Sequence, residues 1–96
     1  MLVLVTYDVS TADKAGERRL RRVARACADY GVRVQKSVFE CTVGDKQWAL
    51  LRDRLLTEID HSSDSLRFYF LDAAAVLRIE HHGGGRPPDL TAPLVV

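Results

Sequence analysis

The N-terminal segment constrains the fold of this chain most strongly. Residues 2–7 form an apolar run, which is followed at once by Asp8 and by the polar stretch of residues 10–13. Successive side chains of a strand point to opposite faces, and neither of the two alternating sets in this run forms a polar face. The run therefore predicts a strand inside a sheet that is covered on both sides.

Asp8 is the first candidate for chemistry. A rigid strand would hold its carboxylate at the strand end, and hard divalent cations such as Mg²⁺ prefer oxygen ligands. One aspartate alone, however, makes a poor metal site. In the structural alternative, Asp8 caps the following turn by accepting hydrogen bonds from backbone N–H groups. Spacing alone favours this structural alternative.

Length and composition predict one soluble domain. Ninety-six residues with 47% hydrophobic side chains are enough for one compact core. The N-terminal apolar run is too short for a membrane span and lacks the basic lead-in of a secretory signal, so we expect a cytoplasmic protein with no membrane partner. Cys27 and Cys41 have no CxxC spacing, which predicts buried reduced thiols rather than a disulfide or a zinc site.

A cluster of positive charge lies on a helix predicted over residues 17–30 and ended by Gly31. A net charge of +1 argues against capture of nucleic acid by the whole molecule, but five arginines gather here: Arg18, Arg19, Arg21, Arg22 and Arg25. Most of them fall opposite the apolar stripe of the helix. A solvated helix face is the usual explanation and is slightly favoured by composition. Arginine at every position instead suits bidentate contact with phosphate, and only Glu17 and Asp29 are near in sequence to neutralise the cluster.

The remaining pattern predicts the fold class. Four further segments have strand patterns: residues 32–35, 37–43, 66–71 and 76–80. The first two are either two short strands or one strand broken near Lys36. A second helix, capped by Asp45, places Trp48 in the core. We therefore expect an α+β protein, a ferredoxin-like βαββαβ sandwich with an additional C-terminal strand.

Two helices would cover only one face of such a sheet. A homodimer that packs sheet against sheet is the economical cover for the other face, and a two-fold axis near the end of the first strand would bring two copies of Asp8 together. Two carboxylates held close either share a proton or take a cation between them, with water at the remaining positions of Mg²⁺. Metal binding and dimerisation would then be linked.

Three segments carry a resemblance to a known family: Tyr7-Asp8-Val9-Ser10, the run RVQKSVFEC at residues 33–41, and Leu66-Arg67-Phe68-Tyr69. Over nearly its whole length the chain resembles the Cas-two family of CRISPR-associated proteins, and R-V-Q-x-S-V-F-E is the most specific element. The resemblance implies a ferredoxin-like homodimer that works with the Cas-one integrase in capturing foreign DNA as new spacers. It also implies a metal-dependent endonuclease acting on RNA or duplex DNA.

The resemblance extends to single residues. Asp8 matches the metal-binding aspartate of the family, which implies a catalytic Asp8 that shares Mg²⁺, or Mn²⁺, with Asp8 of the partner subunit. Tyr7, Ser10 and Phe39 match the motif, and packing or turn geometry explains them at least as well. No general base is evident, because His61, His81 and His82 lie far from Asp8 in sequence and outside the matched segments.

Two functions from different classes therefore stay open. The first is the metal-dependent nuclease. The second is a non-catalytic dimeric scaffold that binds DNA through phosphates and bridges integrase subunits, with these candidate contacts: Arg18, Arg19, Arg22 and Arg33. An RNA-recognition module on the same βαββαβ plan would need the aromatic K/R-G-F/Y-G/A-F run, which the sequence lacks.

The C-terminal part of the sequence predicts a separate arm. Glycines and prolines follow the two adjacent histidines, so we expect the ferredoxin-like domain over residues 1–82 and an arm over residues 83–96. Residues 94–96 are apolar and suit a short strand added to an exposed sheet edge, in the partner subunit or in a Cas-one protein.

Overall fold

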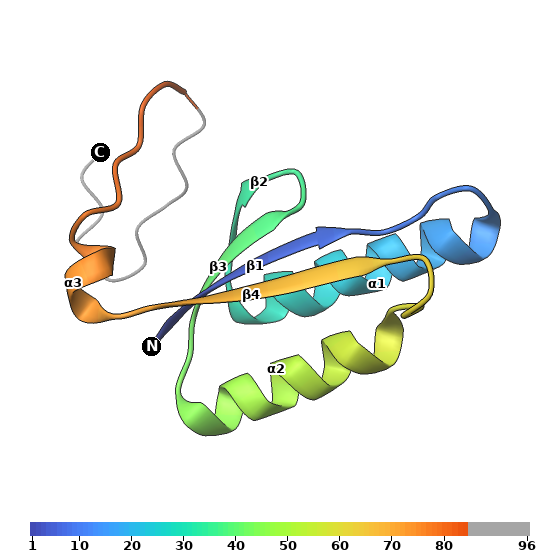
Figure 1. The fold of residues 1–96 in the computed structure, drawn as a ribbon, viewed down its shortest axis with the longest axis horizontal. Coiled ribbons are helices and arrows are strands. Elements are labelled where there is room, and N and C mark those ends of the chain that lie inside the picture. Colours follow the sequence, from blue (N-terminus) through green and yellow to red (C-terminus); the bar gives the residue numbers. More distant parts are fainter. Residues whose placement is uncertain (85–96) are drawn as a thin grey trace.

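The structure is a computed structural model that describes residues 1–84 of the chain. Its elements follow in this order: β1 (Leu2–Asp8), α1 (Lys14–Tyr30), β2 (Val32–Gln35), β3 (Val38–Thr42), α2 (Asp45–Glu58), β4 (Ser65–Leu71) and α3 (Ala73–Val76). The strands form one antiparallel sheet in the order β2-β3-β1-β4, and the two long helices lie together on one side of it (Figure 1). The predicted α+β, ferredoxin-like plan is confirmed.

Capping side chains decide where the two long helices begin. Asp13 accepts a hydrogen bond of 2.8 Å from the backbone N–H of Gly16, so α1 starts at Lys14, three residues before its predicted start. Asp45 is not the cap of α2. That position belongs to Gly44, whose N–H donates to the Gln47 side chain at 3.0 Å, and Asp45 sits in the first turn, where the helix dipole favours a carboxylate.

The core lies between the sheet and the helices. Val3, Val5 and Tyr7 point from β1 toward the helix layer and are buried. Trp48 of α2 is also buried and meets the ring of Phe68 edge-on at a centroid distance of 4.7 Å, so its predicted core position is confirmed. Burial of these side chains fixes which face of each strand looks inward.

The other face of the sheet bears Asp8. On β1 it carries the half-buried Leu2, Leu4 and Thr6, and Asp8 follows them as an exposed side chain. In register with Leu4 lie Glu40 of β3 and Tyr69 of β4. Within residues 1–84 no helix covers this open face, so the predicted need for a cover stands, and the homodimer stays a prediction.

Near residue 36 the chain forms two strands, not one broken strand: a turn separates β2 from β3. The strand predicted over residues 76–80 is wrong. Asp72 accepts a hydrogen bond of 2.7 Å from the N–H of Ala75 and so caps the short helix α3, which the alanines favour. The β-branched Val76 and Ile79 suggested a strand, but neither lies in one.

The predicted pairing strand of residues 94–96 lies outside the described residues, as does nearly all of the predicted arm of residues 83–96. In the part of the chain that the structure describes, no helix combines the length and the apolar character that a membrane span needs.

Candidate functional site

Asp8 is the last residue of β1 and lies opposite Ser65 of β4 in the sheet register. Its side chain is exposed on the open face, at the end of a strand whose preceding residues are paired on both sides. In residues 1–84 its carboxylate accepts no hydrogen bond from the following turn, so the turn-capping alternative is wrong. A strand end of this kind presents a carboxylate to solvent with little backbone freedom.

A single chain supplies too few ligands for a metal at this position. Among residues 1–84 there is no group of three or more His, Cys, Asp or Glu side chains placed to hold an ion. The exposed carboxylate of Asp8 suits Mg²⁺ or Mn²⁺ in chemical type, but it provides one side-chain ligand where a stable protein site usually has more. The remaining protein ligands would have to come from another molecule.

Tyr7 and Phe39 of the matched motif lie on the opposite side of the sheet from Asp8. Their rings stack at a centroid distance of 6.2 Å, and both are buried under the helix layer. The guanidinium of Arg33 lies 5.0 Å from the centroid of Phe39 and donates a long hydrogen bond of 3.5 Å to the Tyr7 hydroxyl. These motif residues therefore form a packing unit that does not contact Asp8.

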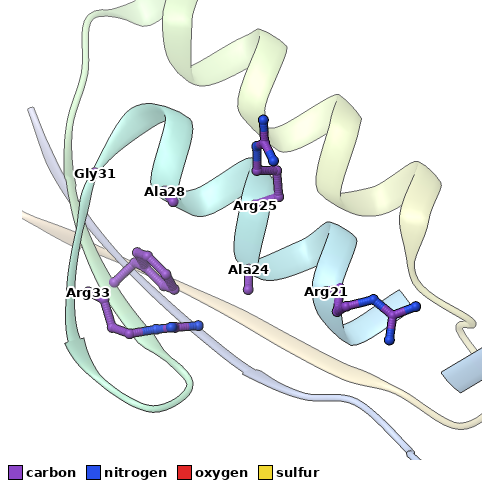
Figure 2. Close-up of a pocket in the computed structure, with 7 residues that line it drawn as sticks. Arg21, Ala24, Arg25, Ala28, Gly31 and Arg33 are labelled. Carbon is purple, nitrogen blue, oxygen red and sulfur yellow. The ribbon is translucent and has the colours of Figure 1, made fainter. Parts of the chain in front are cut away.

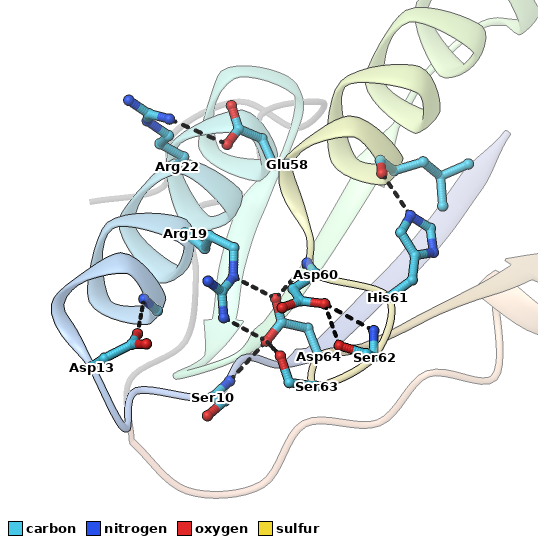
Figure 3. A network of polar contacts seen from close by, with 12 residues as sticks. Ser10, Asp13, Arg19, Arg22, Glu58, Asp60, His61, Ser62, Ser63 and Asp64 are labelled. Carbon is cyan, nitrogen blue, oxygen red and sulfur yellow. Dashed lines mark hydrogen bonds and ion pairs between the residues drawn. The ribbon is translucent and has the colours of Figure 1, made fainter.

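Asp64 is the residue that fixes the turn after Asp8, a role that no pattern in the sequence predicts. Its side chain is fully buried and accepts hydrogen bonds from the N–H groups of Ser10 (3.0 Å) and Asp60 (2.8 Å), as Figure 3 shows. Arg19 adds two more through Nε at 2.8 Å and Nη2 at 3.3 Å. These contacts, led by the hydrogen bond from Arg19, lower the pKa of Asp64 to about 2. The motif residue Ser10 thus serves turn geometry through its backbone.

Acidic side chains that are distant in sequence form ion pairs with part of the arginine cluster. Arg19 is half-buried and its guanidinium is paired with Asp64, so it is less available to a nucleic acid than the exposed arginines of α1. Arg22 lies 3.8 Å from Glu58 of α2 but keeps an exposed side chain, and an exposed pair of this kind is weak. Arg18 is exposed on α1. The sequence could not show that the loop before β4 and the end of α2 supply these carboxylates.

The cysteines take no part in a site. Cys27 and Cys41 are both free and fully buried, as predicted. Burial raises the pKa of the Cys27 thiol to about 12 and that of the Cys41 thiol to about 11, which keeps both protonated at neutral pH.

Comparisons with known proteins agree with this geometry. The family model of CRISPR associated protein Cas2 matches residues 1–79. A CRISPR-associated endoribonuclease Cas2 of Chlorobaculum tepidum is 56% identical over 96 residues, with both chains covered in full. A CRISPR-associated endonuclease Cas2 of Halalkalibacterium halodurans is 48% identical over 95 residues, which is 99% of each chain. These names agree with the predicted nuclease class.

A solved structure gives the same result. The crystal structure of Streptococcus pyogenes Cas2 at pH 6.5 superposes with a TM-score of 0.76 at 51% sequence identity, covering 86% of this chain and all of that one. Sequence and fold thus agree over almost the whole described chain, and the chain belongs to the family of CRISPR associated protein Cas2.

Proposed function

We propose that this chain is a homodimeric, metal-dependent endonuclease of CRISPR adaptation, in which Asp8 of each subunit holds a shared Mg²⁺. The observation that carries the proposal is the position of Asp8: it is an exposed carboxylate on the open face of the sheet, on the same face of β1 as the half-buried Leu2 and Leu4. The face that needs a cover is therefore the face that carries the candidate ligand. The endoribonuclease and endonuclease names of the relatives support the nuclease class and make RNA the first substrate to test.

A two-fold dimer would supply what one chain lacks. An isologous interface brings each residue close to its own copy when that residue lies near the axis, so a sheet-to-sheet dimer could place two Asp8 carboxylates together. Their mutual repulsion would then favour a cation between them. When bound, Mg²⁺ would supply positive charge to the phosphate oxygens and lower the pKa of a bound water. The chain's own part is to hold the two carboxylates at rigid strand ends.

The exposed arginines serve a different contact. Arg18 and Arg22 project from α1 in the helix layer, whereas Asp8 lies on the open face of the sheet. They are therefore placed to hold the phosphates of a duplex across the outside of the dimer rather than to present a phosphate to Asp8. This separation is the specific observation that favours the second candidate function, a DNA-binding scaffold that works with the Cas-one integrase in the acquisition of spacers.

The deciding experiment compares wild type with Asp8→Asn on labelled single-stranded RNA and duplex DNA, with Mg²⁺, with Mn²⁺ and with chelator. Asp53→Asn is the matched control, because Asp53 is an exposed carboxylate on α2, remote in sequence from the strand that carries Asp8. We expect cleavage by wild type and Asp53→Asn that needs the metal, and a loss of at least 100-fold in Asp8→Asn. Cleavage that is unaffected by Asp8→Asn would refute the nuclease site. An inactive wild type that still binds duplex DNA in a salt-dependent manner would support the scaffold.

A further inference from the structure

A groove opens between α1 and β2, on the helix side of the sheet. It is a depression of about 490 Å³ that is largely open to solvent, and these residues line it: Arg21, Ala24, Arg25, Ala28, Gly31, Arg33 and Phe39. Figure 2 shows Ala24 and Ala28 of α1 facing the side of the groove that carries Arg33. The Arg33 guanidinium lies over the ring of Phe39. The groove is therefore remote from the open face that carries Asp8. Its volume lies within the range of about 300–1,000 Å³ that is common for small-ligand sites.

The floor of the groove is a planar cation held in place. The guanidinium of Arg33 rests 5.0 Å from the centroid of Phe39, and Phe39 is itself fixed in the core by its stack on Tyr7. Arg33 is nevertheless an exposed residue, so a ligand can reach its side chain. Nucleic-acid-binding proteins use such guanidinium planes, like aromatic rings, as platforms on which an unpaired base stacks.

The walls of the groove are small and its rim is positive. Ala24 and Ala28 leave room above the platform, and no acidic side chain is among the lining residues. Arg21 is exposed at the rim. Arg25 leans away from Arg33 in Figure 2. Within residues 1–84 its ion pair is an exposed contact of 3.9 Å to Asp29, so little there opposes its turning toward an anion.

Gly31 is no evidence for a ligand. A Cβ at this position would lie 2.5 Å from the Cys41 sulfur and 2.5 Å from the Glu40 carbonyl oxygen, so the glycine is needed for the close approach of β3. The features that point to a ligand are the Arg33 platform and the arginine charges alone.

We propose that this groove binds one nucleotide of a single-stranded nucleic acid. The base stacks on the Arg33 plane beside Ala24 and Ala28, and the flanking phosphates contact Arg21 and Arg25. An acidic protein segment is the less favoured occupant, because carboxylates would make no use of a flat platform. This proposal rests on the proposed function in one respect, that a single-stranded nucleic acid is a substrate. The groove would hold that nucleic acid on the face of the sheet opposite Asp8.

The test measures binding of a fluorescent ten-residue single strand by anisotropy over a series of salt concentrations. Chelator is present throughout, so cleavage and metal binding at Asp8 do not enter. For Arg21→Gln/Arg25→Gln we expect the slope of log K against log salt to fall by about 1.4, because each lost phosphate contact of a single strand removes about 0.7. The matched control is Lys46→Gln/Arg52→Gln, which removes two exposed charges from α2 and should leave the slope near that of wild type.

A second variant tests the platform. Arg33→Lys keeps the charge and loses the plane, so it should affect the base and not the phosphates. Wild type should bind a normal strand at least about five-fold more tightly than an abasic strand of equal length, and Arg33→Lys should bring this ratio close to one. An equal ratio of normal-strand to abasic-strand affinity in wild type and Arg33→Lys would overturn the proposal. The same salt slope for Arg21→Gln/Arg25→Gln and for Lys46→Gln/Arg52→Gln would also overturn it. Displacement of the strand by a short poly-glutamate at equal affinity would also overturn it and would indicate an acidic protein as the occupant.

The two proposals fail separately. If Asp8 is not a nuclease site, binding of the single-stranded nucleic acid in chelator is unchanged. If the groove binds nothing, the comparison of wild type with Asp8→Asn still tests the metal-dependent cleavage.

Discussion

Replacing Asp64 with asparagine should destabilise the protein and loosen the turn that follows Asp8. The Asp64 carboxylate is fully buried and receives four hydrogen bonds of 2.8–3.3 Å from Ser10, Asp60 and Arg19, and a longer one of 3.5 Å from the Ser63 hydroxyl. Asparagine keeps the shape but loses the charge that Arg19 pairs with, and its amide nitrogen cannot accept a hydrogen bond. At least one of these donors therefore loses its partner.

The size of the expected loss of unfolding free energy follows from the lowered pKa of Asp64. The pKa of Asp64 falls from its usual 3.8 to about 2 in the folded protein. A difference of this size corresponds to at most about 2.5 kcal/mol, because one pKa unit is about 1.4 kcal/mol. Screening near the protein surface reduces the expected loss of unfolding free energy at neutral pH to about 1–2 kcal/mol. For a domain of this size each kcal/mol shifts the Tm by roughly 4–8 °C.

The sign of the pH dependence is also determined. Since the folded-state pKa of Asp64 lies below its unfolded value, the stabilisation is fully present above about pH 4 and is lost as the pH falls through about 2. The difference in unfolding free energy between wild type and Asp64→Asn should therefore shrink between pH 4 and pH 2.

Urea unfolding of the two proteins at equal concentration, at pH 7 and again at pH 3, measures both effects. Asp53→Asn removes an exposed carboxylate of α2 and should change the unfolding free energy by less than about 0.5 kcal/mol. Amide hydrogen exchange gives the local result: the N–H of Ser10 should exchange faster in Asp64→Asn. Equal stability of wild type and Asp64→Asn at pH 7, with unchanged protection of Ser10, would refute the assignment of Asp64 as the anchor of this turn.

Two further predictions concern the strand contacts and the thiols. Gly31→Ala should destabilise the protein by about 1–3 kcal/mol, because the new methyl group would overlap Cys41 and the Glu40 carbonyl. Urea unfolding measures this change, and an unchanged unfolding free energy would mean that β3 can move away. Cys27 and Cys41, whose pKa values are raised to about 12 and 11, should not react with a thiol reagent at pH 8 unless the protein unfolds. Rapid labelling of the native protein would contradict their burial.

Local pattern was enough to predict most of the fold. The apolar run of residues 2–7 predicted a strand inside the sheet, and β1 is a central strand. Helical periodicity placed α1, although its start depends on the cap Asp13. The strand predicted over residues 76–80 failed because a capped run of alanines outweighs two β-branched residues in a short segment.

The anchor of the site could not be predicted in the same way. Asp64 lies 54 residues after Ser10 and 45 after Arg19 in the chain, and these groups meet only because β1 pairs with β4 and α1 packs beside α2. Charge counting near α1 found two possible acidic partners, whereas the folded chain brings in Asp64 and Glu58 from elsewhere. Long-range ion pairs of this kind leave no periodic signal in a sequence.

Neighbouring residues of the matched motif have different structural roles, because a strand alternates. Tyr7 points into the core and joins Phe39 and Arg33, whereas Asp8 points to the open face. A motif that is contiguous in sequence therefore divides into a packing unit on one face and a carboxylate on the other. A nucleic-acid strand that contacts both Asp8 and the Arg33 platform would have to pass around an edge of the sheet or reach the platform of a second subunit. Cleavage and strand holding should accordingly respond to different substitutions, with Asp8→Asn affecting the first and Arg33→Lys the second.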